Sequence, residues 1–473
     1  MKEHYKSIAS RSVYALFVLL IVGTSVALLA TPYYKFAVLP GVLLLLMLLL
    51  GRYPQAGFYL IVFLIPFDAY RALSPSYQYL TISKLVGIWI IIVVLFNFIF
   101  NKSQIEEMRS VLWKWLILFF VVNIISTLMS RNFYSSLLEL QNIIITYLFF
   151  TLSLILITER GFYKTLPVIL IVSVSIGSFL LIIGYIFDIP LFTYGLALKT
   201  LKRGIGTSRN PNVFAMMVIF TLPLLSHWFF SSRRTMVKLS VLAAFIMNVV
   251  AIILTYSRSG AILLSLVLLI LLFWNLRRFR PRYLGFVTSA ALIALLATVA
   301  FMPSGYWKFQ KTVTDTMDRS IGARTSYLIV GWRIFKEGPI IGSGPGTFDL
   351  LYSRSEYAAH YADIVNTYLM DAHNSYLEVV VGTGLLGLSI FLIIIWTGLR
   401  NFHLAQQRFR ADGKEDIASL VGAYSLSYIS IVLYFLVFSG TYHKYFWLSL
   451  GLSQVALNLS RKKAEGDQYP GVL

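Results

Sequence analysis

The chain has 473 residues, of which 58% are hydrophobic and 13% charged, and its mean hydropathy is +0.76. These values exclude an ordinary soluble domain and indicate a polytopic membrane protein in contact with membrane lipids. The absence of cysteine excludes thiol catalysis, disulfides and cysteine-ligated metals. The net charge of +20 could suggest nucleic acid, but most basic residues fall in short loops between apolar runs. A positive-inside bias explains them better, so we expect no nucleic-acid partner.

Apolar runs that could cross a bilayer recur along the chain. They lie at roughly 13–30, 36–50, 56–67, 80–100, 111–129, 137–157, 165–187, 211–230, 238–256, 259–275, 283–301, 375–397, 416–438 and 444–459. The runs 36–50 and 56–67 are short and are expected to form a hairpin or tilted pieces. The sequence therefore predicts an all-α integral membrane protein with 12 to 14 transmembrane helices.

The distribution of lysine and arginine predicts the orientation of these helices. With the N-terminus in the cytoplasm, the short basic loops, such as 277–282 and 400–414, all fall on the cytoplasmic side. The opposite, periplasmic side then holds two longer segments, 187–210 and 301–372. We expect an N-terminal transmembrane bundle (1–300), one large periplasmic loop domain (301–372), C-terminal transmembrane helices (373–460) and a cytoplasmic tail (461–473).

A polar motif lies at the N-terminus of one long apolar helix, where His373 and Asn374 are followed by Ser375-Tyr376-Leu377-Glu378. Ser375 and Glu378 have the spacing of a capping box, so the helix is expected to start near Ser375 and to run through Trp396. His373 then lies just before the first turn, near the positive end of the helix dipole. A lone interfacial histidine more often binds headgroups or a carbonyl. A titratable group at the membrane edge is nevertheless a functional candidate.

Three arginine-bearing stretches fall on the same face as His373. They are Lys202–Asn212 with Arg203 and Arg209, Tyr256–Gly260 with Arg258, and Ala323–Leu328 with Arg324. A guanidinium group grips phosphate oxygens in a bidentate manner, and arginines beside helix N-termini can form a pyrophosphate cradle. A single interfacial arginine more often snorkels to lipid headgroups. Three clusters beside a histidine favour a binding site.

Acidic residues are scattered over this face, and no Asp-x-Asp pair occurs in the chain. We therefore expect neither a metal-bound nucleotide-sugar site nor any other cofactor. A group-transfer reaction on this face would lack nucleotides, so its donor should already be activated, as in a lipid pyrophosphate. The segment after Arg324 carries Tyr352, Tyr357, Tyr361 and Tyr368, which could stack on sugars or simply lie at the membrane interface.

These residues together resemble a known pattern. His373-Asn374, followed after nine residues by Gly384-Leu385-Leu386-Gly387, is similar to the histidine motif of bacterial O-antigen ligases. Arg324 with Leu328 resembles the Arg-x-x-x-Leu motif in the large periplasmic loop of that family. Gly338-Pro339 through Phe348, and the stretch from Arg203 to Asn210-Pro211-Asn212, look like the broader O-antigen ligase/polymerase superfamily. The resemblance covers roughly residues 200–400.

The resemblance implies a metal-independent glycosyltransferase of GT-C-type architecture in the bacterial inner membrane, with its active site facing the periplasm. Such an enzyme moves a glycan from undecaprenyl pyrophosphate to lipid A–core oligosaccharide, with inversion.

By the same resemblance, His373 takes the place of the catalytic base and Arg324 that of the essential loop arginine. Arg203 takes the place of a second essential arginine, with Arg209 as a rival, and Arg258 is added from topology and charge. The residues expected to bind the pyrophosphate are Arg203, Arg209, Arg258, Arg324 and Asn374.

Three other functions stay open at this point. A repeat-unit polymerase would use the same donor with a second lipid-linked glycan as acceptor, and a periplasmic protein O-glycosyltransferase would use a protein. A transporter or flippase for the lipid-linked glycan belongs to a different class. Transporters carry charges and broken helices near the bilayer midplane, often in repeated halves. In this sequence the polar groups gather at one face, and no repeat is evident, which favours the enzyme.

Overall fold

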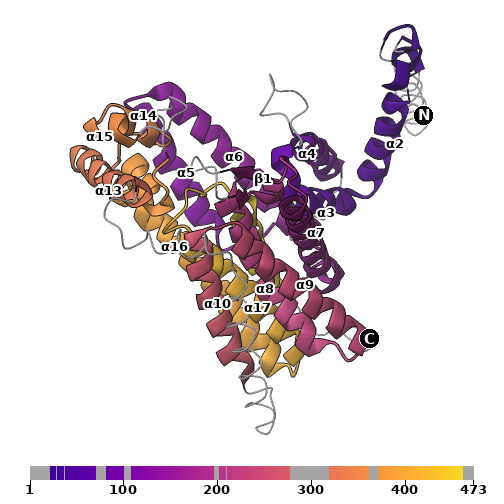
Figure 1. The fold of residues 1–473 in the computed structure, drawn as a ribbon. Coiled ribbons are helices and arrows are strands. Elements are labelled where there is room, and N and C mark those ends of the chain that lie inside the picture. The colour runs from indigo at the N-terminus through magenta and orange to yellow at the C-terminus, as the bar shows by residue number, and fades with distance from the viewer. Residues whose placement is uncertain are drawn as a thin grey trace.

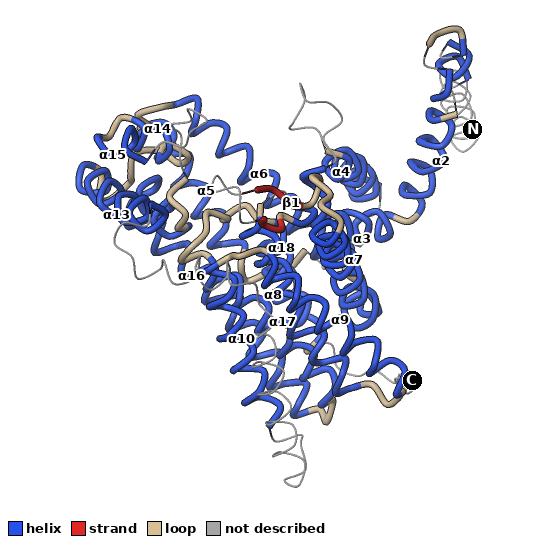
Figure 2. Tube along the Cα trace, in the orientation of Figure 1, coloured by secondary structure: helices blue, strands red, loops and turns tan. Residues whose placement is uncertain are grey.

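A computed structural model of the chain describes residues 22–27, 29–32, 34–36, 38–70, 81–100, 108–195, 202–208, 210–276, 319–361 and 371–461. Helices make up nearly all of these segments, as Figures 1 and 2 show. The α-helices are α2 (Leu39–Arg52), α3 (Pro54–Leu64), α4 (Ile82–Phe100), α5 (Trp113–Leu128), α6 (Phe133–Leu156), α7 (Leu166–Ile186), α8 (Pro211–Ser231), α9 (Thr235–Leu254), α10 (Arg258–Leu276), α13 (Arg319–Glu337), α14 (Phe348–Ser353), α15 (Glu356–Tyr361), α16 (Ser375–Ala411), α17 (Glu415–Tyr434) and α18 (Lys444–Leu459).

The remaining elements are short. They are the 3₁₀ segments η1 (Tyr34–Phe36), η2 (Ile65–Tyr70) and η6 (Gly206–Ser208), the π-helical turn η5 (Gly161–Thr165), and the strands β1 (Thr193–Gly195) and β2 (Lys202–Gly204). The two strands pair antiparallel, with Tyr194 opposite Arg203, and are drawn in red in Figure 2.

The structure confirms an all-α, multi-pass membrane protein. Among the described residues, six helices are long and apolar enough to cross a membrane, or up to seven if one bent pair counts as a single span. That pair is Pro40–Arg52 with Pro54–Asp68, bent by 113°, as in a broken span or a re-entrant loop, so the expectation of a hairpin or tilted pieces stays a prediction. The expected count of 12 to 14 depends partly on 283–301, which lies outside the described residues, and stays a prediction.

Helix α8 is the central helix of the bundle. Every residue from Phe214 to Leu225 is buried, and α8 packs against α7, α9, α10 and α17. Pro223 lies inside α8 and has no N–H to donate, which loosens the backbone bonds of the preceding turn. The hydroxyl of Ser427 on α17 donates to the carbonyl of Phe220 at 2.6 Å, so a side chain satisfies a backbone acceptor in that turn.

Helix α16 is broken at Gly384, where φ is 66° and ψ is −168°. The loop 338–346, which follows α13, fills the break. Four backbone bonds join them: Ser343 N to Val381 O (2.9 Å), Gly344 N to Gly382 O (3.0 Å), Leu385 N to Pro339 O (2.8 Å) and Leu386 N to Ile340 O (3.3 Å). The uninterrupted apolar helix expected from Tyr376 to Trp396 is therefore wrong in detail. The backbone groups freed by the break are satisfied inside the protein, as a membrane segment requires.

Helices α13, α14 and α15 form a compact group at the upper left of Figure 1 and share a small core of their own with the start of α16. Its buried members include Tyr327, Phe348, Tyr352 and Val381. Tyr352 is completely buried, and its hydroxyl lies 2.7 Å from Ser326 Oγ, so it is a core residue and cannot stack on a sugar. Tyr368 and the side chain of Tyr361 lie outside the described part of the chain.

Several helix ends meet at one end of the bundle, which we call the site face and define by Arg203, Ser257, His373 and Tyr434. Helices α8, α10, α16 and α18 begin there, and α9 and α17 end there, as expected for a chain that crosses back and forth. The first helical residue of α16, Ser375, donates its backbone N–H to Phe435 O at 2.9 Å, which ties α16 to the end of α17.

The N-terminal helices are tied to the same end by an ion pair between Lys444 at the start of α18 and Asp68 in η2. Ser83 of α4 donates to the same carboxylate at 2.5 Å.

Candidate functional site

His373 lies two residues before the start of α16 and adopts a left-handed backbone conformation, with φ of 48°. The N-cap of the helix is Asn374, whose Oδ1 accepts from Leu377 N at 3.0 Å. The helix thus starts at Ser375 as expected, but Asn374 takes the capping role that the capping-box pattern gave to Ser375. A non-glycine residue at positive φ is uncommon, and such strain occurs preferentially at functional sites.

Arg324 and Tyr327 approach His373 from α13. They are three residues apart and therefore lie on one face of that helix. The rings of Tyr327 and His373 have centroids 5.9 Å apart, at an interplanar angle of 52°. Further along the same helix, Gly331 lies against Leu377, where a Cβ on the glycine would come within 2.8 Å of that side chain. The close packing of α13 on α16 holds the arginine beside the histidine.

The surroundings of His373 favour the neutral imidazole. Burial lowers its pKa below the ordinary 6.5, the positive charge of Arg324 lowers it further, and the carboxylate of Asp371 raises it. The net shift is downward, so the ring is unprotonated near neutral pH and able to accept a proton.

Arg203 belongs to β2, and its Nε–H donates to the carbonyl of Thr255 at 2.8 Å. That carbonyl lies at the C-terminal end of α9, where helix carbonyls lack intrahelical partners and a positive charge is favourable. The bond fixes Arg203 against the turn between α9 and α10, which carries Arg258.

That turn is held by a polar cluster. Tyr256 turns the chain with φ of 53°, and α10 begins at Arg258. The Oγ of Ser257 donates to Asn212 Oδ1 at 2.7 Å, accepts from Gly260 N at 3.0 Å and lies 3.3 Å from the hydroxyl of Tyr434. The start of α8, the α9–α10 turn and the end of α17 therefore meet at one serine.

Two of the expected arginines come together at Tyr434, which interacts electrostatically with both Arg203 and Arg324. Arg324 interacts in turn with His373. The structure thus brings His373, Arg324 and Arg203 to one region of the site face, although more than 100 residues separate Arg203 from Arg324 in sequence. Arg258 lies in the turn that binds Arg203, and Arg209 lies outside the described residues.

A group of acidic residues near His373 was missed in the sequence. Glu139 of α6, Asp349 of α14, Asp371 and Glu378 of α16 interact electrostatically with one another. They come from three separate parts of the chain, at 139, 349 and 371–378, so sequence spacing could not have revealed the whole group: acidic residues that are scattered in the sequence lie near one another in the structure. Burial raises the pKa of Asp349, and the neighbouring Asp371 raises it further.

These carboxylates do not form a metal-ligand arrangement. Within the segments that the structure describes, no three His, Asp or Glu side chains are grouped so that they could hold a metal ion. Glu378 instead accepts from the backbone N–H of Ala372 at 3.3 Å, which braces the segment that carries His373.

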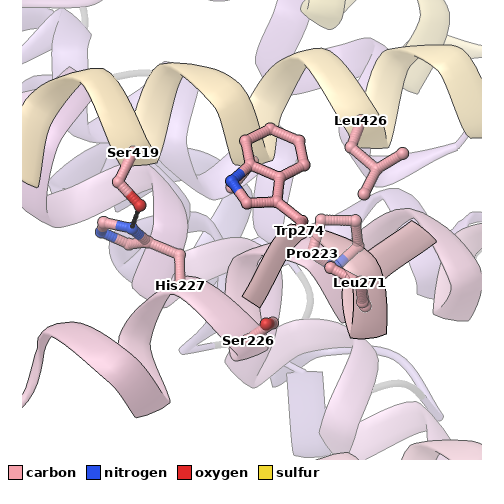
Figure 3. Close-up of a pocket in the computed structure, with 8 residues that line it drawn as sticks. Pro223, Ser226, His227, Leu271, Trp274, Ser419 and Leu426 are labelled. Carbon is pink, nitrogen blue, oxygen red and sulfur yellow. Dashed lines mark hydrogen bonds between the residues drawn. The ribbon is translucent and has the colours of Figure 1, made fainter. Parts of the chain in front are cut away.

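Two hollows lie away from these residues. Figure 3 shows a cavity of about 20 Å³ among α8, α10 and α17, where His227 Nδ1 lies 3.1 Å from Ser419 Oγ. Its volume suits a single water molecule. A groove of about 420 Å³ between α5 and α6 is lined almost entirely by apolar side chains. Neither hollow is lined by any of the candidate residues, so neither is the candidate site.

In the comparison with protein families, residues 242–392 match a family described as O-antigen ligase. The matched region contains Arg258, Arg324, His373 and Asn374, whereas Arg203 precedes it. No curated protein matches the chain. Residues 242–392 of this helical, multi-pass chain are therefore similar to the O-antigen ligase/polymerase family of membrane proteins.

Proposed function

We propose that the chain is an O-antigen ligase, a glycosyltransferase that moves a glycan from undecaprenyl pyrophosphate to lipid A–core oligosaccharide. In this proposal it has a GT-C-type architecture and acts without a metal at the periplasmic face of the bacterial inner membrane. The observation that carries the proposal is the half-buried His373, whose pKa is lowered, beside Arg324, with Arg203 in the same region through Tyr434. A proton acceptor next to paired guanidinium groups suits a reaction that releases a pyrophosphate.

The proposed reaction is a single displacement. The acceptor hydroxyl oxygen attacks the anomeric carbon as the bond from that carbon to the pyrophosphate oxygen breaks. The pyrophosphate leaves with the bonding electron pair, and the hydroxyl proton passes to the imidazole of His373. Arg203, Arg258 and Arg324 stabilise the charge that develops on the leaving group. Because the attack occurs on the face opposite the leaving group, the anomeric configuration is inverted.

The helix end at His373 supports these roles. Asn374 uses its Oδ1 as the N-cap of α16, and its amide N–H groups are of the type that donates to phosphate oxygens. The bond from Ala372 N to Glu378 holds the backbone before His373. The proposed base is therefore carried by a braced segment, as general-base catalysis requires.

The test is a reconstituted transfer reaction. Purified protein with undecaprenyl-pyrophosphate-linked glycan and rough lipopolysaccharide should give glycan-capped lipopolysaccharide without ATP or added metal. His373→Ala should lower the rate by about 10²–10⁴-fold. His403→Ala is the matched control, because His403 lies on the same helix and is bonded to Gln407. Elongated lipid-linked glycan without capped lipopolysaccharide would instead identify a repeat-unit polymerase.

A further inference from the structure

The hydroxyl of Tyr434 is oriented by its neighbours. Ser257 Oγ has a single proton, and it donates this proton to Asn212 Oδ1 at 2.7 Å. The same oxygen accepts from Gly260 N at 3.0 Å. In the 3.3 Å contact between the two hydroxyls, the donor is therefore Tyr434 and the acceptor is Ser257. The phenolic oxygen of Tyr434 is left as an acceptor, with its lone pairs directed away from Ser257.

Arg203 is held near this hydroxyl by its bond to the carbonyl of Thr255, two residues before Ser257, and the guanidinium groups of Arg203 and Arg324 both interact electrostatically with Tyr434. Tyr434 and Ser257 are 0% and 2% exposed, so the phenol cannot turn to solvent. Cations in buried surroundings repel one another more strongly than they do in water. The negative end of an oriented hydroxyl dipole that acts on both guanidinium groups offsets part of that repulsion.

The chemistry of the phenol matters for a phosphate site. A carboxylate in the same place would neutralise one guanidinium and compete with the phosphate for its N–H groups. A neutral phenol attracts both arginines and leaves their charges intact. The acidic residues near the site interact instead with Asp371, and none of them is among the groups that act on Tyr434.

We propose that Tyr434 is a positioning residue of the pyrophosphate site: its oriented hydroxyl holds Arg203 and Arg324 together so that a diphosphate meets a preformed pair of charges. The ligand class is a lipid diphosphate, for which two adjacent guanidinium groups match two phosphate groups. A lipid monophosphate needs only one of them. This assignment rests on the proposed function and adds the residue that makes the site selective for the diphosphate.

The experiment compares two ligands on the full chain in detergent. The affinities for undecaprenyl pyrophosphate and undecaprenyl monophosphate are measured by equilibrium binding, with Tyr434→Phe, which removes only the hydroxyl. We expect the diphosphate affinity to fall about tenfold, equivalent to about 1.4 kcal/mol. The monophosphate affinity should change less than about twofold. Tyr428→Phe is the matched control, since Tyr428 is also 0% exposed on α17 but its hydroxyl donates to Ile395 O.

Unchanged diphosphate affinity in Tyr434→Phe overturns the assignment, and so does an equal loss for both ligands, which would reflect a packing role. If Tyr434→Phe is not recovered as folded protein, Ser257→Ala provides the second test, because it removes the acceptor of the phenolic proton. It must also reduce the preference for the diphosphate, and an unchanged preference overturns the assignment.

The variants Arg203→Ala and Arg324→Ala show whether a negative result concerns only the role of Tyr434 or the proposed function as a whole. If both retain wild-type diphosphate affinity, the arginine cradle itself is wrong. If both variants lose diphosphate affinity while Tyr434→Phe keeps it, only the role assigned to Tyr434 is wrong.

Discussion

Three features of the surroundings act on the pKa of His373: burial, the charge of Arg324 and the carboxylate of Asp371. Burial and Arg324 lower its pKa, and Asp371 raises it. A bound pyrophosphate would compensate the charge of Arg324 and add negative charge nearby, so the pKa of His373 should rise when the donor binds. The proposed base would then become stronger only in the complex that is ready to react.

The pH dependence of transfer tests this coupling. The profile of kcat/KM reports the free enzyme, and that of kcat reports the enzyme–substrate complex. We expect the acidic limb of kcat/KM to lie below pH 6.5 and that of kcat to lie at higher pH, in rates measured between about pH 5 and 8. Asp371→Asn should move both limbs to lower pH, because it removes the group that raises the pKa. Coinciding limbs would show that donor binding does not act on the base.

The second prediction at the residue scale is that the guanidinium group of Arg324, and not only its charge, is needed for transfer. Arg324→Ala should lower transfer by about 10²–10³-fold, the usual effect of losing a donor to a developing anion. Arg324→Lys should restore little of it, because a point charge does not replace the two-pronged grip. Arg333→Lys is the control on α13. Arg333 lies away from the site and forms an ion pair with Glu356, with 2.5 Å between the nitrogen and oxygen atoms. Full activity of Arg324→Lys would show that Arg324 does not act through a bidentate contact with phosphate.

At the scale of elements, the break in α16 sets the geometry of the site. The loop 338–346 hydrogen-bonds to both sides of Gly384 and also connects to α13, which carries Arg324. The short helical piece before the break begins at Ser375, two residues after His373. The proposed base and the loop arginine therefore stand on two segments fastened together at one glycine.

Gly384→Ala tests this element. Its φ and ψ fall in a region adopted almost only by glycine, where another residue costs on the order of 1–3 kcal/mol. A Cβ would also lie 2.2 Å from Ile340 O, which is a backbone atom and cannot turn aside. We expect a large fall in the apparent Tm in detergent. Gly413→Ala is the control, since Gly413 also has positive φ but a Cβ there would meet nothing within 4 Å. Equal Tm values for the two variants would contradict the role of the break.

At the scale of the whole molecule, the orientation in the membrane remains a prediction from the basic loops. Because the chain has no cysteine, single cysteines can report it. Arg354→Cys, between α14 and α15, should react with an impermeant maleimide that has access only to the periplasm. Asp412→Cys, between α16 and α17, should react only after the inner membrane is permeabilised. The reverse pattern would place the candidate site in the cytoplasm and rule out the proposed reaction.

The helices, the polar motif at His373 and the three arginine stretches could be predicted from sequence, because each depends on neighbouring residues. Apolar runs of sufficient length must form helices in lipid, where every backbone group needs a partner. Asn210 caps α8 just before Pro211, and α10 begins at Arg258, as local signals at helix starts indicate.

Only the tertiary structure decided how these pieces meet. Glycine in a sequence permits a break in α16 but does not require one; the loop after α13 makes it possible by satisfying the freed backbone groups. Tyr434 gave no signal in the sequence, since its role depends on Ser257 and on two arginines from distant segments. The acidic group around Asp371 also gave no signal in the sequence, because its members come from distant segments. Electrostatic partners are set by distance in space, and in this chain the fold brings together residues as far apart as Glu139 and Glu378.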